Sequence, residues 1–181
     1  GRAPLKTRGG AGTATAAPPA REAEIIYSRE FRGPVTTLAA MDGALVVSYG
    51  SRVEALAWAG GRLRRTAFHD GPWAVAGAAV VKNFVVAADA IAGLRFLHAI
   101  AGVRNFIELA KEWDASAGVG VTSAVCGRKL CLVSTDAGGA VRAAAYDAAH
   151  PDSWRGKRLV PLGALHMGSV GTACLGGGVR A

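Results

Sequence analysis

Residues 35–69, VTTLAAMDGALVVSYGSRVEALAWAGGRLRRTAFH, carry the pattern that specifies the fold of this 181-residue chain. They hold four short runs rich in Val, Leu and aromatic residues, which are separated by Asp42-Gly43, by Gly50 and by Gly60-Gly61. An Asp-Gly pair accommodates the positive φ angles of a two-residue hairpin turn, and the runs are too short for helices. The pattern therefore predicts an antiparallel meander whose four strands are residues 35–41, 44–48, 53–58 and 63–69.

The same four-strand unit recurs twice further along the chain. The second strand of each unit reads LVVSYG from Leu45, FVVAAD from Phe84 and LCLVSTD from Leu130. These strands recur about every 40 to 45 residues, which is the length of a four-stranded blade in a β-propeller. We therefore expect an all-β fold, a partial β-propeller of about three four-stranded antiparallel blades, at about residues 33–72, 73–115 and 118–168. A β-sandwich made of the same meanders is the alternative.

The N-terminal part of the chain has a different composition. Residues 1–22, GRAPLKTRGGAGTATAAPPARE, consist mainly of Gly, Ala, Pro and Thr, without a period that could bury one face. We expect them to form a flexible basic arm or linker before a partial propeller region at residues 23–181. The formal net charge is +8, and half of it comes from residues 1–21. The predicted propeller region is therefore only mildly basic, which gives weak support to direct nucleic-acid binding.

The remaining composition places the chain in a broad class. Three Cys are too few for a fold built on disulfides and are typical of a reducing compartment. Charged residues interrupt the apolar stretch at residues 74–103, and the N-terminal residues lack the apolar run of a signal peptide. We therefore expect a soluble protein and, because the sequence does not begin with Met, a segment of a longer one.

Two residue pairs could carry chemistry. Asp89 and Asp136 follow the second strands of successive units, but a catalytic pair of carboxylates must share one cleft, about 5–10 Å apart. An Asp directly after a strand normally caps a turn, so we interpret both as turn caps. Cys126 and Cys131 flank a hairpin turn and could face each other, yet a zinc site needs two further ligands. We interpret them as small buried residues and expect no catalytic residue, no cofactor and no metal.

Two basic clusters remain as candidate contact sites. They are Arg62, Arg64 and Arg65, and then Arg155, Lys157 and Arg158. Both lie beside predicted loops, and we expect no aromatic stacking platform among them. A solvated loop face is the simplest interpretation, and a weak electrostatic contact with RNA or with an acidic partner is the alternative.

Several stretches match the motifs of one known family, in the same order along the chain. Residues 32–38, RGPVTTL, resemble KGPVTAL at the entry to a blade, and residues 81–89, VKNFVVAAD, resemble VKNFILAAD. Leu159 and residues 165–168 resemble a closing RL…FHVG segment. These motifs belong to the large (A) subunit family of the cleavage and polyadenylation specificity factor, and the chain resembles its C-terminal propeller region over residues 24–172.

The resemblance implies a non-enzymatic scaffold in the nucleus that serves pre-mRNA 3′-end cleavage and polyadenylation. It also implies WD-repeat and zinc-finger proteins as partners. Pre-mRNA would lie nearby, contacted mostly through these partners, and no membrane would be involved. Two sister scaffolds share the architecture, an adaptor of a DNA-damage ubiquitin ligase and a propeller subunit of a splicing complex. The adaptor typically has GDFILVGD where residues 82–89 read KNFVVAAD, which favours the polyadenylation family. A propeller enzyme or binder whose site lies in blades outside this sequence is the remaining alternative.

Overall fold

The computed structural model describes residues 23–126 and 129–174, and this part of the chain contains twelve β-strands and one short 3₁₀ helix. The first four strands are β1 (Val35–Met41), β2 (Ala44–Tyr49), β3 (Arg52–Ala59) and β4 (Arg62–Asp70). The next four are β5 (Val75–Val81), β6 (Phe84–Asp89), β7 (Gly93–His98) and β8 (Ile107–Lys111). The last four are β9 (Gly118–Cys126), β10 (Lys129–Asp136), β11 (Ala140–Ala145) and β12 (Val160–His166), with helix η1 (Pro151–Ser153) before β12. The predicted arm at residues 1–22 lies outside the described residues.

Each group of four strands forms its own antiparallel sheet in sequence order. The sheets are β1-β2-β3-β4, β5-β6-β7-β8 and β9-β10-β11-β12. The turn between β1 and β2 has Gly43 at φ +69°, as the Asp-Gly pair predicts. Strands that are neighbours in the chain are therefore neighbours in the sheet, so each sheet forms from local pairing alone.

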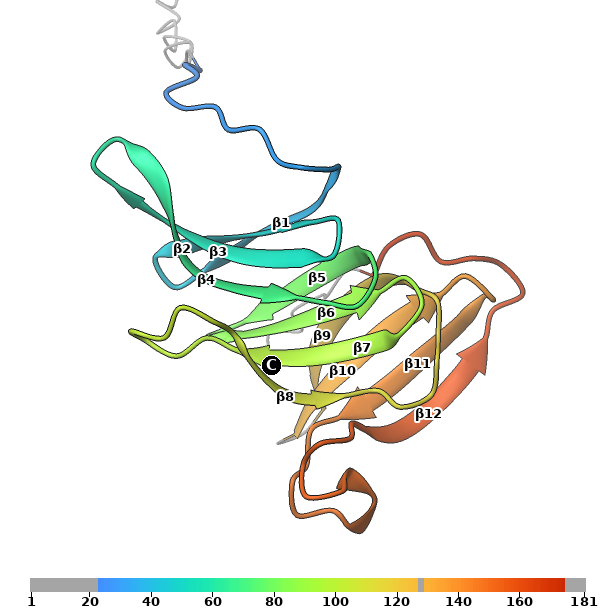
Figure 1. The fold of residues 1–181 in the computed structure, drawn as a ribbon. Helices are drawn as coiled ribbons and strands as arrows, with labels where there is room; N and C mark the ends of the chain where they lie inside the picture. The colour runs from blue at the N-terminus through green and yellow to red at the C-terminus, as the bar shows by residue number, and fades with distance from the viewer. Residues whose placement is uncertain (1–22, 127–128, 175–181) are drawn as a thin grey trace, which may run out of the picture.

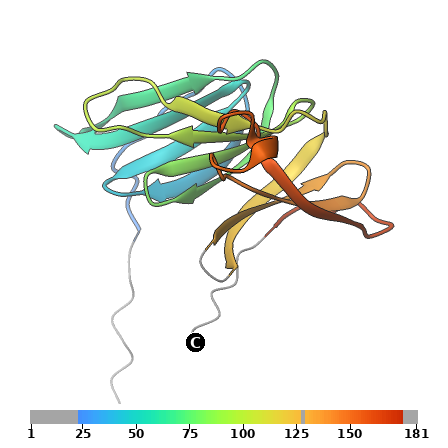
Figure 2. The ribbon, with the colours of Figure 1, turned by 90° about the horizontal axis from the view of Figure 1, so that it is seen from below.

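The three sheets follow one another like the blades of a fan, shown in cyan, green and orange in Figure 1 and from below in Figure 2. The first strands of the sheets, β1, β5 and β9, lie next to one another. Two hydrogen bonds join the first two of them, from the Thr36 hydroxyl to the Val75 carbonyl (2.8 Å) and from the Ala78 amide to the Thr37 hydroxyl (2.9 Å). This arrangement is the partial β-propeller expected from the sequence, and three sheets in series are not the two-layer sandwich of the alternative.

The hydrophobic core is divided between the two spaces that separate successive sheets. The first space holds a cluster that includes Val46, Val53, Val85 and Leu97, all of them fully buried. The second space holds apolar residues of the second and third sheets, namely Val86, Ala88, Leu94, Phe96, Ala110, Val121, Leu132, Ala144 and Leu159. The middle sheet is thus buried on both faces, which explains why its strands are apolar at successive positions rather than at alternate ones.

Residues 23–34 run along the outer face of the first sheet without forming a strand. The ring of Tyr27 packs edge-to-face on Trp58, and the ring of Phe31 packs on Tyr49, with centroids 5.7 and 4.8 Å apart. This cover is incomplete, because Leu38 of the same sheet remains 65% exposed. On the third sheet Leu165 is 68% exposed.

The connection between β11 and β12 is the main feature that the sequence pattern did not predict. It contains η1 and three consecutive residues with positive φ, Trp154, Arg155 and Gly156. Such angles depend on packing around the loop and leave no alternating pattern in the sequence. Among the described residues, no helix has the length and hydropathy needed to cross a membrane.

Candidate functional site

The first basic cluster lies at the turn from β3 to β4 and along β4. Arg62 and Arg64 are exposed, and neither forms an ion pair with a described residue. Arg65 is different, because its guanidinium stacks over Phe68 (4.8 Å to the ring centroid) and lies 3.4 Å from the carboxylate of Glu54. The three arginines therefore do not act as one group.

Glu54 is a buried carboxylate, with its side chain only 1% exposed. It accepts hydrogen bonds from Arg29 (3.2 Å), Arg65 (3.4 Å) and the Tyr49 hydroxyl (2.9 Å), and Arg52 lies 3.7 Å away. Burial, followed by the hydrogen bond to Glu54, raises the pKa of Tyr49. The arrangement joins residues 23–34 to the first sheet, so Arg65 has a structural partner and is a weak candidate for contacting a ligand.

Arg52 extends this network to the protein surface. Its guanidinium donates two hydrogen bonds to the carboxylate of Asp70, at 2.6 and 2.8 Å. The hydrogen bond raises the pKa of Arg52 and lowers the pKa of Asp70. Both groups are thus held in their charged forms, and their charges largely cancel.

The second basic cluster lies in the loop between η1 and β12. Ser153 is fully buried and holds the loop together, because its hydroxyl donates to the Ala148 carbonyl (3.2 Å) and accepts from the Gly156 amide (3.1 Å). Gly156 has φ +78°, and a Cβ atom there would lie 3.0 Å from the Cβ of Ala148. The loop therefore has a defined conformation that presents Arg155 and Lys157 on the surface.

This loop is attached to the middle sheet by backbone pairing. The Lys111 amide donates to the Lys157 carbonyl (3.1 Å), and the Leu159 amide donates to the Lys111 carbonyl (2.9 Å). Lys111 ends β8, so the second basic cluster straddles two sheets. The pairing adds a fourth exposed cation, which sequence spacing does not associate with residues 155–158.

Two exposed tryptophans lie within the second cluster. The rings of Trp113 and Trp154 are 5.1 Å apart with an interplanar angle of 41°. The Arg158 guanidinium lies 5.7 Å from the Trp113 centroid and 3.5 Å from the Asp114 carboxylate. The expectation that no aromatic platform accompanies the basic clusters is therefore wrong for this one. The sequence holds one signal of this aromatic pair, because Trp154 is adjacent to Arg155. Trp113 comes close to the basic cluster only through the fold.

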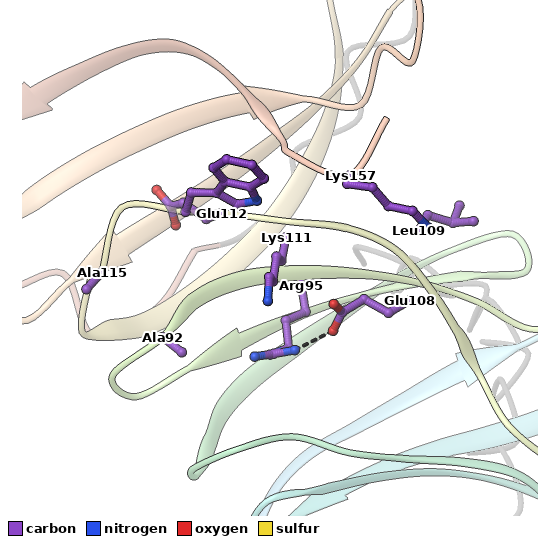
Figure 3. A pocket seen from close by; sticks show the side chains of 9 residues that line it. Ala92, Arg95, Glu108, Leu109, Lys111, Glu112, Ala115 and Lys157 are labelled. Atoms are coloured by element: carbon purple, nitrogen blue, oxygen red, sulfur yellow. Dashed lines mark hydrogen bonds and ion pairs between the residues drawn. The ribbon is translucent and has the colours of Figure 1, made fainter. Parts of the chain in front are cut away.

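A cavity of about 690 Å³ adjoins this cluster. Figure 3 shows Lys111 and Lys157 at its walls, together with the ion pair between Arg95 and Glu108. Trp113 and Glu112 also line it. The cavity thus has cationic, anionic and aromatic walls, and it is too mixed in charge for a purely anionic ligand.

The structure gives both predicted carboxylates the role of turn caps. Asp89 accepts from the Ile91 and Ala92 amides, both at 3.0 Å. Asp136 accepts from the Ala140 amide (2.9 Å) and from Arg142 (3.0 Å), and these hydrogen bonds lower the pKa of Asp136. Each carboxylate holds the turn directly after its own strand, as interpreted from the sequence.

Cys126 and Cys131 do not lie opposite each other in the β9–β10 pair. Cys126 pairs with Lys129 and Cys131 with Ala124, so the two cysteines are not direct cross-strand partners. Cys131 is buried. Within residues 23–126 and 129–174, no three His, Cys, Asp or Glu side chains are grouped so that they could hold a metal ion.

The fold defines the chain as part of a β-propeller protein whose exposed chemistry lies at blade edges and loops. A family model described as the CPSF A subunit region matches residues 15–177. The chain therefore belongs to the CPSF A subunit family.

Two curated relatives come from plants. One, from Oryza sativa subsp. japonica, is named "Probable cleavage and polyadenylation specificity factor subunit 1" and is 28% identical over 144 residues. The other, from Arabidopsis thaliana, is named "Cleavage and polyadenylation specificity factor subunit 1" and is 27% identical over 145 residues. Each match covers 80% of this chain and 10% of the relative. The chain thus spans about a tenth of the length of these relatives.

Proposed function

We propose that this chain is part of a scaffold subunit of the nuclear machinery that cleaves and polyadenylates pre-mRNA, and that it has no catalytic activity of its own. The observation that carries the proposal is the family match over residues 15–177. The names of the two plant relatives support the process. In this proposal residues 1–22 serve as a basic arm and the three blades as the docking body.

The surface chemistry is consistent with docking rather than with catalysis. The two carboxylates considered for catalysis hold turns, and the cavity beside the second basic cluster has no nucleophile paired with a base among its lining residues. A propeller presents large loop faces on a rigid body, and such faces suit partner binding without a deep cleft. The proposed partners are WD-repeat and zinc-finger subunits of the polyadenylation specificity complex.

The six basic residues named from the sequence are unequal in this proposal. Arg62 and Arg64 are exposed and available for weak contacts with RNA or an acidic partner. Arg65 and Arg158 are engaged with Glu54 and Asp114. Arg155 and Lys157 remain the better candidates of the second cluster.

Affinity purification of the full-length protein from nuclear extract tests the proposal. We expect to recover poly(A) polymerase together with WD-repeat and zinc-finger subunits. Recovery of a cullin ligase would instead indicate the DNA-damage adaptor, and recovery of splicing factors would indicate the spliceosomal scaffold. Hydrolytic activity retained by the purified segment would contradict the absence of catalysis.

A further inference from the structure

Two exposed tryptophans and three exposed cations form one surface patch at the junction of the second and third sheets. We call the set Trp113, Trp154, Lys111, Arg155 and Lys157 the tryptophan patch. Trp113 is 47% exposed and Trp154 is 63% exposed. Rings of this size usually bury most of their area, so an adjacent exposed pair is unusual on a free surface.

The geometry leaves one ring available for stacking. Trp113 has Arg158 over its ring at 5.7 Å and Trp154 beside it at 5.1 Å. Trp154 has no second ring or guanidinium packed on it among the described residues. Its more exposed indole is therefore a platform for one planar group.

The patch is held in place before any ligand arrives. Trp154 and Arg155 have φ angles of +49° and +59°, a left-handed conformation that is costly for side chains other than glycine. The buried Ser153 hydroxyl and the pairing of Lys111 with residues 157–159 fix this loop. A fixed platform loses little conformational entropy when it binds.

The cations around the platform are uncommitted. Lys111, Arg155 and Lys157 are exposed, and none of them forms an ion pair with a described residue. None of the nearby carboxylates forms an ion pair with these cations: Glu108 pairs with Arg95, Asp114 pairs with Arg158, and Glu112 accepts hydrogen bonds from the Leu94 amide and the Ser116 hydroxyl. Three exposed cations without an ion-pair partner thus belong to the same loop region as the stackable ring.

We propose that the tryptophan patch binds single-stranded RNA, with one base stacked on Trp154 and the adjoining phosphates held by Lys111, Arg155 and Lys157. A base that stacks on a surface indole must be unpaired, which excludes a duplex. Base stacking combined with cationic contacts to the backbone is the usual chemistry of single-strand binding. This inference rests on the proposed function only for the choice of RNA over DNA.

A nucleic acid fits the patch better than an acidic peptide does. Glu108 and Glu112 line the same cavity as Lys111 and Lys157, and their negative charges disfavour a peptide with a carboxylate at every residue. A nucleotide places its charge on the phosphate alone and offers a neutral base to the ring. The cavity of about 690 Å³ beside Trp113 leaves room for a neighbouring nucleotide.

Fluorescence anisotropy with the complete 181-residue chain and a labelled single-stranded RNA of about eight nucleotides tests the stacking. Stacking on one aromatic ring is worth about 5-fold to 150-fold in affinity. We therefore expect Trp154→Ala to weaken binding within this range and Trp154→Phe to recover part of the affinity. Trp73→Ala is the matched control, because Trp73 is also exposed (56%) and lies outside the patch. It should leave the affinity unchanged.

The salt dependence tests the phosphate contacts independently. Each phosphate contact on a single strand contributes about 0.7 to the slope of log K against log salt concentration. We expect Lys157→Gln to reduce the slope by about 0.7, and Lys82→Gln, at an exposed lysine in the β5–β6 turn, to leave it unchanged.

Four outcomes would overturn the proposal. They are no RNA binding by the unaltered chain, equal losses in the Trp154 and Trp73 variants, tighter binding of a DNA strand of the same sequence, and displacement of the RNA by a glutamate-rich peptide at equal concentration. The proposed function is tested separately, because the full-length Trp154→Ala protein should still recover its WD-repeat and zinc-finger partners. Failure of the unaltered protein to recover them would refute the scaffold role and leave the anisotropy result standing.

Discussion

Removing the charge of Glu54 tests whether the buried ion network stabilises the first sheet. Glu54→Gln keeps the volume and one carbonyl oxygen but removes the negative charge. The carboxylate accepts hydrogen bonds from Tyr49, Arg29 and Arg65 at 2.9, 3.2 and 3.4 Å. A hydrogen bond to a charged group is worth about 1 kcal/mol more than a neutral one, so the gross loss is about 3 kcal/mol.

Two effects reduce this loss. Burying the charged carboxylate costs a desolvation free energy that is absent when a neutral glutamine takes its place. The side chains of Arg29 and Arg65 are also 30% and 47% exposed, so water stabilises them once the negative charge is gone. We therefore expect a net loss of about 1–2 kcal/mol in the free energy of unfolding, equivalent to a melting temperature about 2–8 °C lower.

Urea unfolding measures this change, with far-UV circular dichroism as the global signal and tryptophan fluorescence as a second signal. Asp70→Asn is the matched control, because Asp70 also binds Arg52 but is 46% exposed. An exposed ion pair contributes less than about 1 kcal/mol, and added salt should abolish its effect but not that of Glu54. A Glu54→Gln variant as stable as the unaltered chain would refute the reasoning, since desolvation would then cancel the whole network.

Three further predictions concern single groups. Burial lowers the pKa of His69, so the unfolded chain binds the proton more tightly than the folded chain does. The free energy of unfolding should therefore fall as the pH drops below about 6.5. Urea midpoints measured against pH should show this fall, and His69→Gln should flatten the pH dependence. Asp136→Asn should cost about 1 kcal/mol at neutral pH by weakening the contact with the partly exposed Arg142. Because the Asp136 pKa is lowered, the stability that Asp136 contributes is present above the usual carboxyl pKa and is lost as the pH falls through the folded pKa. The free energies of unfolding of Asp136→Asn and of the unaltered chain should therefore converge in acid. A difference that stays constant with pH would contradict the role assigned to Asp136. Gly156→Ala combines a left-handed φ with a 3.0 Å approach to Ala148. The free energy of unfolding should therefore fall by about 1–3 kcal/mol, and hydrogen exchange in the loop should increase. Unchanged exchange would show that the loop adapts to the added methyl group.

The blade pattern could be predicted because its causes are local. The alternation of apolar runs with Asp42-Gly43 and Gly60-Gly61 depends on the φ angles of the turn residues and on the two-residue period of a strand. All twelve expected strands form, and Gly43 has the positive φ that the turn requires. The turn-capping role of Asp89 is local in the same way, since its partners are the amides of Ile91 and Ala92, two and three residues further along the chain.

The candidate site could be predicted only in part. The basic residues at 155–158 are visible in the sequence, but their value as a site depends on Trp113 and Lys111. These two residues precede residues 155–158 by more than forty positions, Lys111 at the end of β8 in the second sheet and Trp113 just after it. They reach it because the Lys111 backbone pairs with residues 157 and 159. No pattern within one blade specifies a contact between two blades.

The amino-acid pattern alone specifies three repeated four-stranded sheets, and its motifs identify the family to which the chain belongs. Which charged residues are neutralised and which remain available depends on how the sheets and loops pack in three dimensions. Arg65 and Arg158 look like their neighbours in the sequence, yet the fold places Glu54 and Asp114 beside them and leaves Arg64 and Lys157 exposed. The difference lies in the sequence separation over which the interactions act. Hairpin turns and strand alternation depend on residues a few positions apart, whereas the burial and pairing of charges depend on how complete sheets pack against one another.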